Sequence, residues 1–232
     1  MDYNIVLKSI KESCTALLRD SLVGIYIHGS VAFGCFDWNK SDIDYIVVLN
    51  NPLSAENKTA LIKETMRINK SSPPKGLEMS AVLKEHCVNF KHPTPYELHF
   101  SNTHQETAGG TDKDLAAHFT VIKHTGIVLC GEPINNVFGD VLHEYYFDSI
   151  KSDIKNAKEE INHNQTYYIL NLCRVLAYKQ DGLILSKTAG GEWGLKNTDG
   201  KYSGVIKAVL INEKADSNSV HKFCDYLLNR IG

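Results

Sequence analysis

The stretches VGIYIHGS (residues 23–30) and SDIDYIVVL (residues 41–49) decide the fold of this chain. Each contains a short run of β-branched and aromatic residues, which is typical of a buried strand. A third run of this kind, LEMSAVL, follows at residues 77–83. Patterns of helical period cover residues 5–18 and 55–68, before and between these runs. Strands interleaved with helices in this way predict an α/β (α+β) fold for the N-terminal part of the chain.

The C-terminal part of the chain has a different pattern, with long stretches of helical period. These stretches are residues 137–162, residues 167–180, residues 205–211 and a last helix from about Ser219 to the end. No Gly/Ser linker marks the change in pattern. We therefore predict an α/β domain over residues 1–140 and an all-α helical bundle domain over residues 141–232.

The composition excludes several classes of protein. With 43% hydrophobic and 22% charged residues, the chain is an ordinary folded protein rather than a disordered one. A net charge of −2 argues against a nucleic-acid partner and against a template-directed polymerase, because these need a basic surface. No apolar run reaches the roughly 18 residues that span a bilayer, so no membrane partner is predicted.

The spacing of the cysteines and histidines predicts a protein of a reducing compartment that binds no zinc. The six cysteines are scattered without a C-x-x-C pair, which predicts free thiols. The ten histidines show no H-E-x-x-H spacing. The first residues, MDYN, lack the basic patch and the apolar stretch of a signal peptide. We expect a cytoplasmic monomer.

Asp42 and Asp44 are the first candidate metal ligands. Residues i and i+2 of a strand share a face, so the two carboxylates point the same way and Ile43 points to the other side. Two close carboxylates repel each other unless a cation lies between them, and such hard oxygen ligands favour Mg²⁺. The turn at Gly29 and Ser30, which follows the preceding strand, suits a phosphate group.

Glu78 is a third candidate carboxylate. It stands near the start of the apolar run at residues 77–83. From there it is able to join Asp42 and Asp44 in one cleft, as a metal ligand, as a base that takes a proton from an attacking hydroxyl, or as both. The alternative is an edge-strand glutamate that faces water.

The combination Gly29-Ser30, Asp42-x-Asp44 and Glu78 resembles the active-site signature of the nucleotidyltransferase superfamily, which DNA polymerase β shares with antibiotic adenylyltransferases. Most of the chain is also similar to the aminoglycoside nucleotidyltransferases of the streptomycin/spectinomycin type. The similar stretches are YIHGS (26–30), SDID (41–44), LE (77–78), ELHF (97–100), DLA (114–116), NLCRVL (171–176) and SKTAGGEW (186–193).

This resemblance implies a nucleotidyltransferase domain with a mixed sheet, a helical bundle, and ATP and substrate bound between them. It implies that Gly29 and Ser30 hold the terminal phosphates, that Asp42 and Asp44 bind Mg²⁺, and that Glu78 is the catalytic base. A basic pair that contacts the triphosphate corresponds to Arg174 and Lys187. For Arg174 the alternative is an internal salt bridge, and for Lys187 a solvated turn. Trp193 is either a core residue or a platform for adenine.

The resemblance further implies that AMP passes from ATP to a hydroxyl of a cationic aminoglycoside or aminocyclitol, with release of pyrophosphate. Acidic candidates for binding this acceptor are Glu97, Asp153, Glu159 and Glu160, and Asn164 falls at the position of another acidic contact. Lys155 stands where the streptomycin-modifying relatives have a tryptophan that stacks on the drug, which argues against streptomycin as the acceptor. An orphan enzyme that adenylylates another metabolite or a protein is the alternative.

Overall fold

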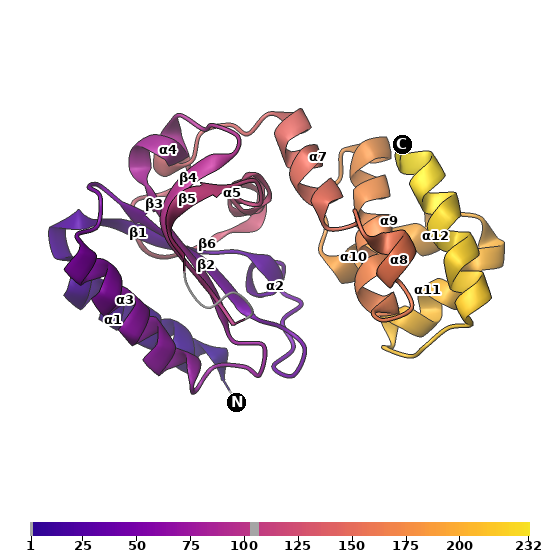
Figure 1. Cartoon of the computed structure of the whole chain (residues 1–232), viewed down its shortest axis with the longest axis horizontal. Helices are drawn as coiled ribbons and strands as arrows, with labels where there is room; N and C mark the ends of the chain where they lie inside the picture. Colours follow the sequence, from indigo (N-terminus) through magenta and orange to yellow (C-terminus); the bar gives the residue numbers. More distant parts are fainter. Residues whose placement is uncertain (1, 103–106) are drawn as a thin grey trace. The chain divides into compact units, whose positions relative to one another are not determined.

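The computed structural model describes residues 2–102 and 107–232. The chain divides into two compact units, Met1–Leu142 and His143–Gly232 (Figure 1). The first contains a sheet with helices on both faces, and the second is helical. The predicted fold class is therefore confirmed. Among the described residues, no helix combines the length and the apolar character needed to cross a membrane.

The first unit is built on a mixed sheet of six strands. The strands are β1 (Leu22–Ile27), β2 (Ile43–Leu49), β3 (Leu77–Leu83), β4 (Thr94–Ser101), β5 (Thr107–Asp112) and β6 (Ile127–Gly131). Their order across the sheet is β5-β4-β3-β2-β1-β6. The central strands β2 and β3 run parallel, and the other neighbouring pairs are antiparallel. The first three strands lie where the apolar runs predicted them, so this prediction is confirmed.

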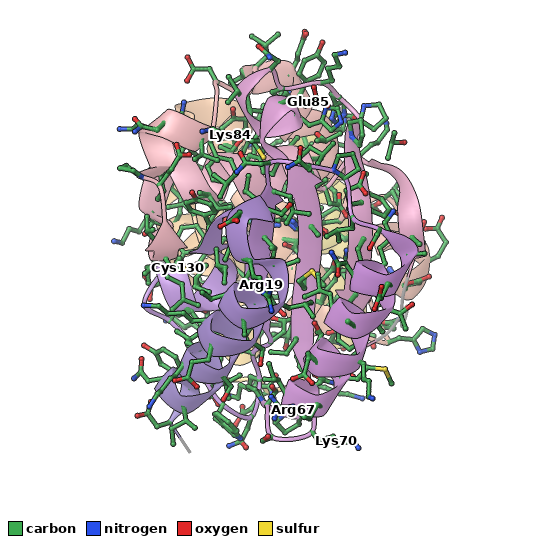
Figure 2. The ribbon with its side chains drawn as sticks, turned by 90° about the vertical axis from the view of Figure 1, so that its left-hand side faces the viewer. Arg19, Arg67, Lys70, Lys84, Glu85 and Cys130 are labelled. Atoms are coloured by element: carbon green, nitrogen blue, oxygen red, sulfur yellow. The ribbon has the colours of Figure 1, made fainter. Side chains whose placement is uncertain are left out.

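Alternate residues of the central strands bury two separate cores. Tyr45 and Val47 of β2 face one core together with α1 (Tyr3–Leu18) and α3 (Ala55–Asn69). These two helices lie side by side over the sheet (Figure 2), where Arg67 Nη2 of α3 donates a hydrogen bond to Ser13 Oγ of α1 at 3.3 Å.

The opposite face of the sheet is covered mainly by α5 (Leu115–Thr125), with α4 (Lys84–Val88) and α6 (Ile134–Val137) beside it. Ile46 of β2 belongs to this second core, and so does Phe119 of α5. The period of two along β2 therefore also decides where its polar residues lie, because Asp44 shares a face with Ile46.

The second unit consists of helices packed around α9. Its helices are α7 (His143–Ser152), α8 (Ala157–Glu160), α9 (Gln165–Asp181), α10 (Lys187–Asn197), α11 (Ser203–Leu210) and α12 (Ser217–Ile231). Short 3₁₀ helices lie at Gly200–Tyr202 here and at Arg19–Ser21 in the first unit, where α2 (Gly29–Ala32) is a further short helix. Helix α9 ends at Gly182, whose φ of 67° is the left-handed conformation that glycine adopts at helix ends.

The prediction of one helical stretch over residues 137–162 was wrong. Val137 and Phe138 are buried in the second core of the first unit, whereas Tyr146 and Ile150 are buried in the second unit. The apolar residues of this stretch thus belong to two different cores. The periodic pattern continued across the junction, although the helix did not.

Helix α10 was not predicted, because its sequence KTAGGEWGLKN contains three glycines, which disfavour a helix interior. Packing against α9 explains them. A Cβ at Gly190 would lie 2.9 Å from the N, Cα and Cβ atoms of Arg174, and one at Gly194 would lie 2.7 Å from Cys173 Sγ. The glycines therefore allow two helix backbones to approach each other closely.

Gly190→Ala is expected to lower the free energy of unfolding by about 1–3 kcal/mol, because the new methyl group forces α10 away from α9. Gly204→Ala is the matched control, since a Cβ there meets nothing within 4 Å and alanine favours a helix. Urea denaturation of the two variants provides the comparison. Equal stability of the two variants would show that the close packing has no energetic importance.

Candidate active site

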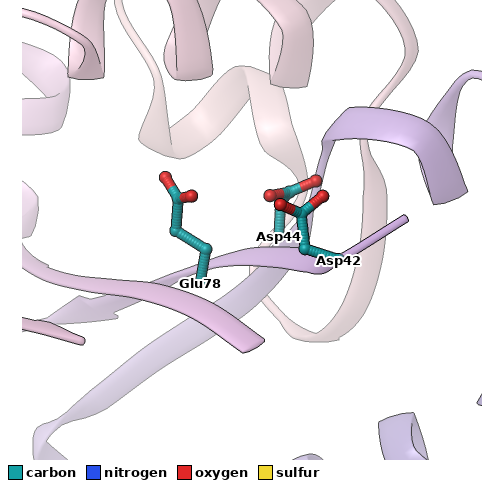
Figure 3. A group of neighbouring side chains, drawn as sticks. All are labelled: Asp42, Asp44 and Glu78. Carbon is teal, nitrogen blue, oxygen red and sulfur yellow. The ribbon is translucent and has the colours of Figure 1, made fainter. Parts of the chain in front are cut away.

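The parallel pair β2 and β3 brings the three predicted carboxylates together. Asp44 and Glu78 stand directly opposite each other in the register of the two strands. Asp42 comes two residues before Asp44 and therefore shares its face of the sheet. Figure 3 shows the three side chains on this face, and one carboxylate oxygen from each lies within 4.8 Å of the others. Because β3 is an inner strand, Glu78 is not an edge-strand residue.

Gly29 allows the turn after β1 to approach this group of carboxylates. Its φ of 60° lies in the left-handed region, which most residues avoid. A Cβ at Gly29 would also lie only 1.9 Å from Asp44 Oδ2. The neighbouring backbone is fixed to the same strand, because the His28 N–H donates a hydrogen bond to the Asp44 carbonyl at 3.1 Å. The tight turn therefore determines how the Asp44 carboxylate is placed.

The donor atoms of this region fit a divalent cation and a phosphate. Three acidic groups within 4.8 Å of one another repel unless positive charge lies between them, and their oxygen atoms are the ligands that Mg²⁺ prefers. Ser30 Oγ is buried, and the described residues give it no hydrogen-bond partner. Such a hydroxyl is able to donate to a ligand oxygen.

Two histidines beside the carboxylates were missed by the sequence analysis. His28 precedes the Gly-Ser turn, and His118 lies on α5. Their ring centroids are 4.4 Å apart, and His118 Nε2 lies 3.8 Å from Glu78 Oε1. Burial, with His118 as a second cause, lowers the pKa of His28 well below its ordinary value, so this ring is neutral. The position of His28 next to Gly29 was the available signal; His118 had none, because it is distant in the sequence.

In the second unit, Arg174 forms an internal ion pair. Its Nη2 donates to Asp153 Oδ2 at 2.5 Å, and the Tyr167 hydroxyl donates to the other oxygen, Oδ1, at 3.1 Å. Burial and Asp153 raise the pKa of Tyr167. Lys187 Nζ lies 5.1 Å from the centroid of the Tyr167 ring, at a cation–π distance. Arg174 and Lys187 therefore belong to one connected group of side chains.

The candidate residues for acceptor binding make local contacts. Glu97 Oε2 accepts from the Leu53 N–H at 3.1 Å and lies 3.1 Å from Lys58 Nζ, so Glu97 is not part of the carboxylate group. Glu160 accepts from the Tyr168 hydroxyl at 2.6 Å, and this bond is the main reason that the pKa of Tyr168 rises to about 12. Asn164 caps α9 by accepting from the Tyr167 N–H at 3.1 Å.

The structure also shows the surroundings of Asp153, Lys155 and Trp193, which the sequence analysis singled out. Asp153 is the partner of Arg174 described above, and Lys155 is exposed. Trp193 is buried in the second unit, where its indole N–H donates to Asp181 Oδ2 at 2.7 Å. Trp193 is therefore a core residue of the helical unit.

The known proteins that this chain is similar to are adenylyltransferases, as the sequence motifs predicted. Residues 136–229 match the family described as aminoglycoside adenylyltransferase, C-terminal domain. Spectinomycin 9-adenylyltransferase of Enterococcus faecalis is 24% identical over 201 residues, which cover 80% of this chain and 77% of that protein. The crystal structure of the spectinomycin adenylyltransferase from the same organism, with ATP and spectinomycin, has the same fold. Its TM-score is 0.82 at 20% identity, over 98% of both chains.

Proposed function

We propose that the protein transfers AMP from ATP to a hydroxyl of an aminocyclitol or aminoglycoside, on the premise that residues 136–229 match the C-terminal domain family of the aminoglycoside adenylyltransferases. The observation that carries the proposal is the convergence of Asp42, Asp44 and Glu78 within 4.8 Å on one face of the sheet. A group of acids that binds a metal ion beside a nucleotide is what the transfer of a nucleotidyl group requires.

In the proposed reaction, the acceptor hydroxyl attacks the α-phosphorus of ATP in line with the leaving pyrophosphate. Glu78 accepts the hydroxyl proton, a role that its partly exposed carboxylate (33% of the side chain) permits. Asp42 and Asp44 hold the Mg²⁺, which when bound would offset the charge on the phosphate oxygens. Ser30 donates its hydroxyl to a phosphate oxygen, and Gly29 lets this turn lie against the Asp44 carboxylate.

Arg174 and Lys187 are proposed to bind the triphosphate, as the family resemblance implies. The Arg174 guanidinium is partly buried and ion-paired, with 15% of the side chain exposed, and the described residues give its Nε no partner. Asp153 holds the guanidinium in one orientation, and its permanent positive charge suits a phosphate group. Lys187 adds a second positive charge on the same group of side chains.

For the acceptor, we propose a cationic, spectinomycin-like or streptomycin-like compound. The similarity to spectinomycin 9-adenylyltransferase of Enterococcus faecalis favours spectinomycin, and Lys155 in place of a stacking tryptophan disfavours streptomycin. Glu160 is exposed and is proposed to contact a cationic group of the acceptor. Asn164 and Glu97 are proposed as further contacts of the acceptor; Asn164 also caps α9, and Glu97 also pairs with Lys58.

Incubation of the protein with ATP, Mg²⁺ and a panel of aminoglycosides tests this function. We expect pyrophosphate release and a product heavier by one AMP group with spectinomycin, and a lower rate or none with streptomycin. Omission of ATP and boiled protein serve as controls. ATP binding without turnover of any panel member would overturn the antibiotic assignment in favour of another metabolite or a protein acceptor.

A further inference from the structure

The face of the sheet that carries Glu78 also holds two histidines that the proposed reaction does not use. His118, on α5, lies with its Nε2 3.8 Å from Glu78 Oε1. Only 18% of the His118 side chain is exposed, against 33% for Glu78. The ring of His28, which is 4% exposed, lies against the other imidazole with centroids 4.4 Å apart and planes at 32°.

The surroundings of the two ring nitrogens of His118 differ. Nδ1 is buried, and the described residues offer it no hydrogen-bond partner. Nε2 faces the Glu78 carboxylate. The negative charge of that group favours a ring proton on Nε2, and the neutral ring of His28 on the other side offers no competing charge. These contacts favour the ring tautomer with its proton on Nε2.

We propose that His118 is a positioning residue for Glu78, and that its Nε2–H restrains the carboxylate in the orientation that accepts the proton of the acceptor hydroxyl. This inference rests on the proposed function. A separation of 3.8 Å is longer than a direct hydrogen bond, and such contacts in ligand-free sites shorten when substrate binds. His28, packed against the ring, keeps His118 in place.

A purely structural role explains this histidine poorly. His118 lies between Ala117 and Phe119 in an apolar helix, where leucine is the ordinary choice for packing against the second core. A buried, unpartnered Nδ1 is unfavourable for folding. Stability sacrificed next to a reacting group is a common feature of functional sites. The contact with Glu78 supplies the missing reason for a polar ring at this position.

The kinetic test compares His118→Leu, His118→Gln and the control His124→Leu, which changes an exposed histidine on the same helix. We expect His118→Leu to lower kcat about 10- to 100-fold, the size typical of groups that orient a reacting residue, with KM for ATP unchanged. His118→Gln restores most of kcat, because its amide N–H reaches towards the position of Nε2. Thermal unfolding of His118→Leu should occur at or above the wild-type temperature.

In an active enzyme, equal kcat for His118→Leu and His124→Leu would overturn the positioning role of His118 but not the proposed function. Failure of His118→Gln to restore activity would do the same. Failure of the wild-type protein to modify any acceptor would instead overturn the proposed function. Long-range ¹H–¹⁵N spectra of the histidine rings need no substrate, so they test the role of His118 separately from the proposed function. We expect His118 to carry its proton on Nε2 and to shift in Glu78→Gln. A proton on Nδ1, or no shift, would contradict the contact.

Discussion

Asp42→Asn is expected to abolish AMP transfer, with a fall in kcat of at least about a thousandfold. The reason is electrostatic. Asparagine keeps the size of the side chain but removes a negative charge from the group formed with Asp44 and Glu78. The proposed Mg²⁺ then has one charged ligand fewer, and the phosphates lose the cation that offsets their charge.

The measurement is pyrophosphate release over a range of Mg²⁺ concentrations, together with circular dichroism to show that the fold is intact. Asp37→Asn is the matched control. It makes the same chemical change in the loop before β2, where asparagine is able to accept the same hydrogen bond from the Asn39 N–H. We expect its activity to equal that of the wild type. Near-full activity of Asp42→Asn would refute the metal-site interpretation.

Glu78→Gln is expected to lower kcat by about 10²–10⁴-fold, the usual contribution of a general base. Glutamine has the shape of glutamate but does not accept the proton of the acceptor hydroxyl. The affinity for ATP should change little, because Asp42 and Asp44 remain to hold the proposed metal. Binding of ATP by calorimetry and turnover under saturating ATP measure the two effects separately.

Glu85→Gln is the control for this substitution, since Glu85 is an exposed glutamate just after β3 (Figure 2). Its kcat is expected to match that of the wild type. Parallel losses of ATP affinity and turnover in Glu78→Gln would assign Glu78 to metal binding instead of proton transfer. A normal kcat would remove Glu78 from the reaction altogether.

The strands that carry the carboxylates were predictable from local sequence. In β2 an apolar run follows Asp44, and in β3 a run interrupted only by Ser80 follows Glu78. Both strands are buried on both faces, which gives a strong signal in sequence. The period of two then places Asp42 and Asp44 on one side. The opposition of Asp44 and Glu78 depends on strand pairing, which local periodicity does not specify.

Elements whose conformation depends on distant contacts were harder to predict. Strand β4 carries Glu97 and Pro95 among mixed polar residues, and β5 contains adjacent glycines, so neither has a clear strand pattern. Helix α10 exists despite its glycines because α9 packs against them. In each case tertiary packing outweighs local propensity.

The same limit applies to the candidate site. Asp42, Asp44 and Gly29 lie within one short stretch, so their spacing carried the signal. His118 comes 40 residues after Glu78, inside an apolar helix that shows no pattern of its own. Only the packing of α5 on the sheet places it beside the carboxylate. Asp153, in the turn after α7, and Arg174, in α9, likewise form an ion pair between segments that are distant in the sequence.

The most direct test of the central claim is a crystal structure with Mn²⁺ and an unreactive α,β-methylene analogue of ATP, measured for the anomalous signal of manganese. We expect a manganese peak at bonding distance from the carboxylate oxygens of both Asp42 and Asp44, with a phosphate oxygen next to it. Bound analogue with no manganese peak at these two aspartates would contradict it.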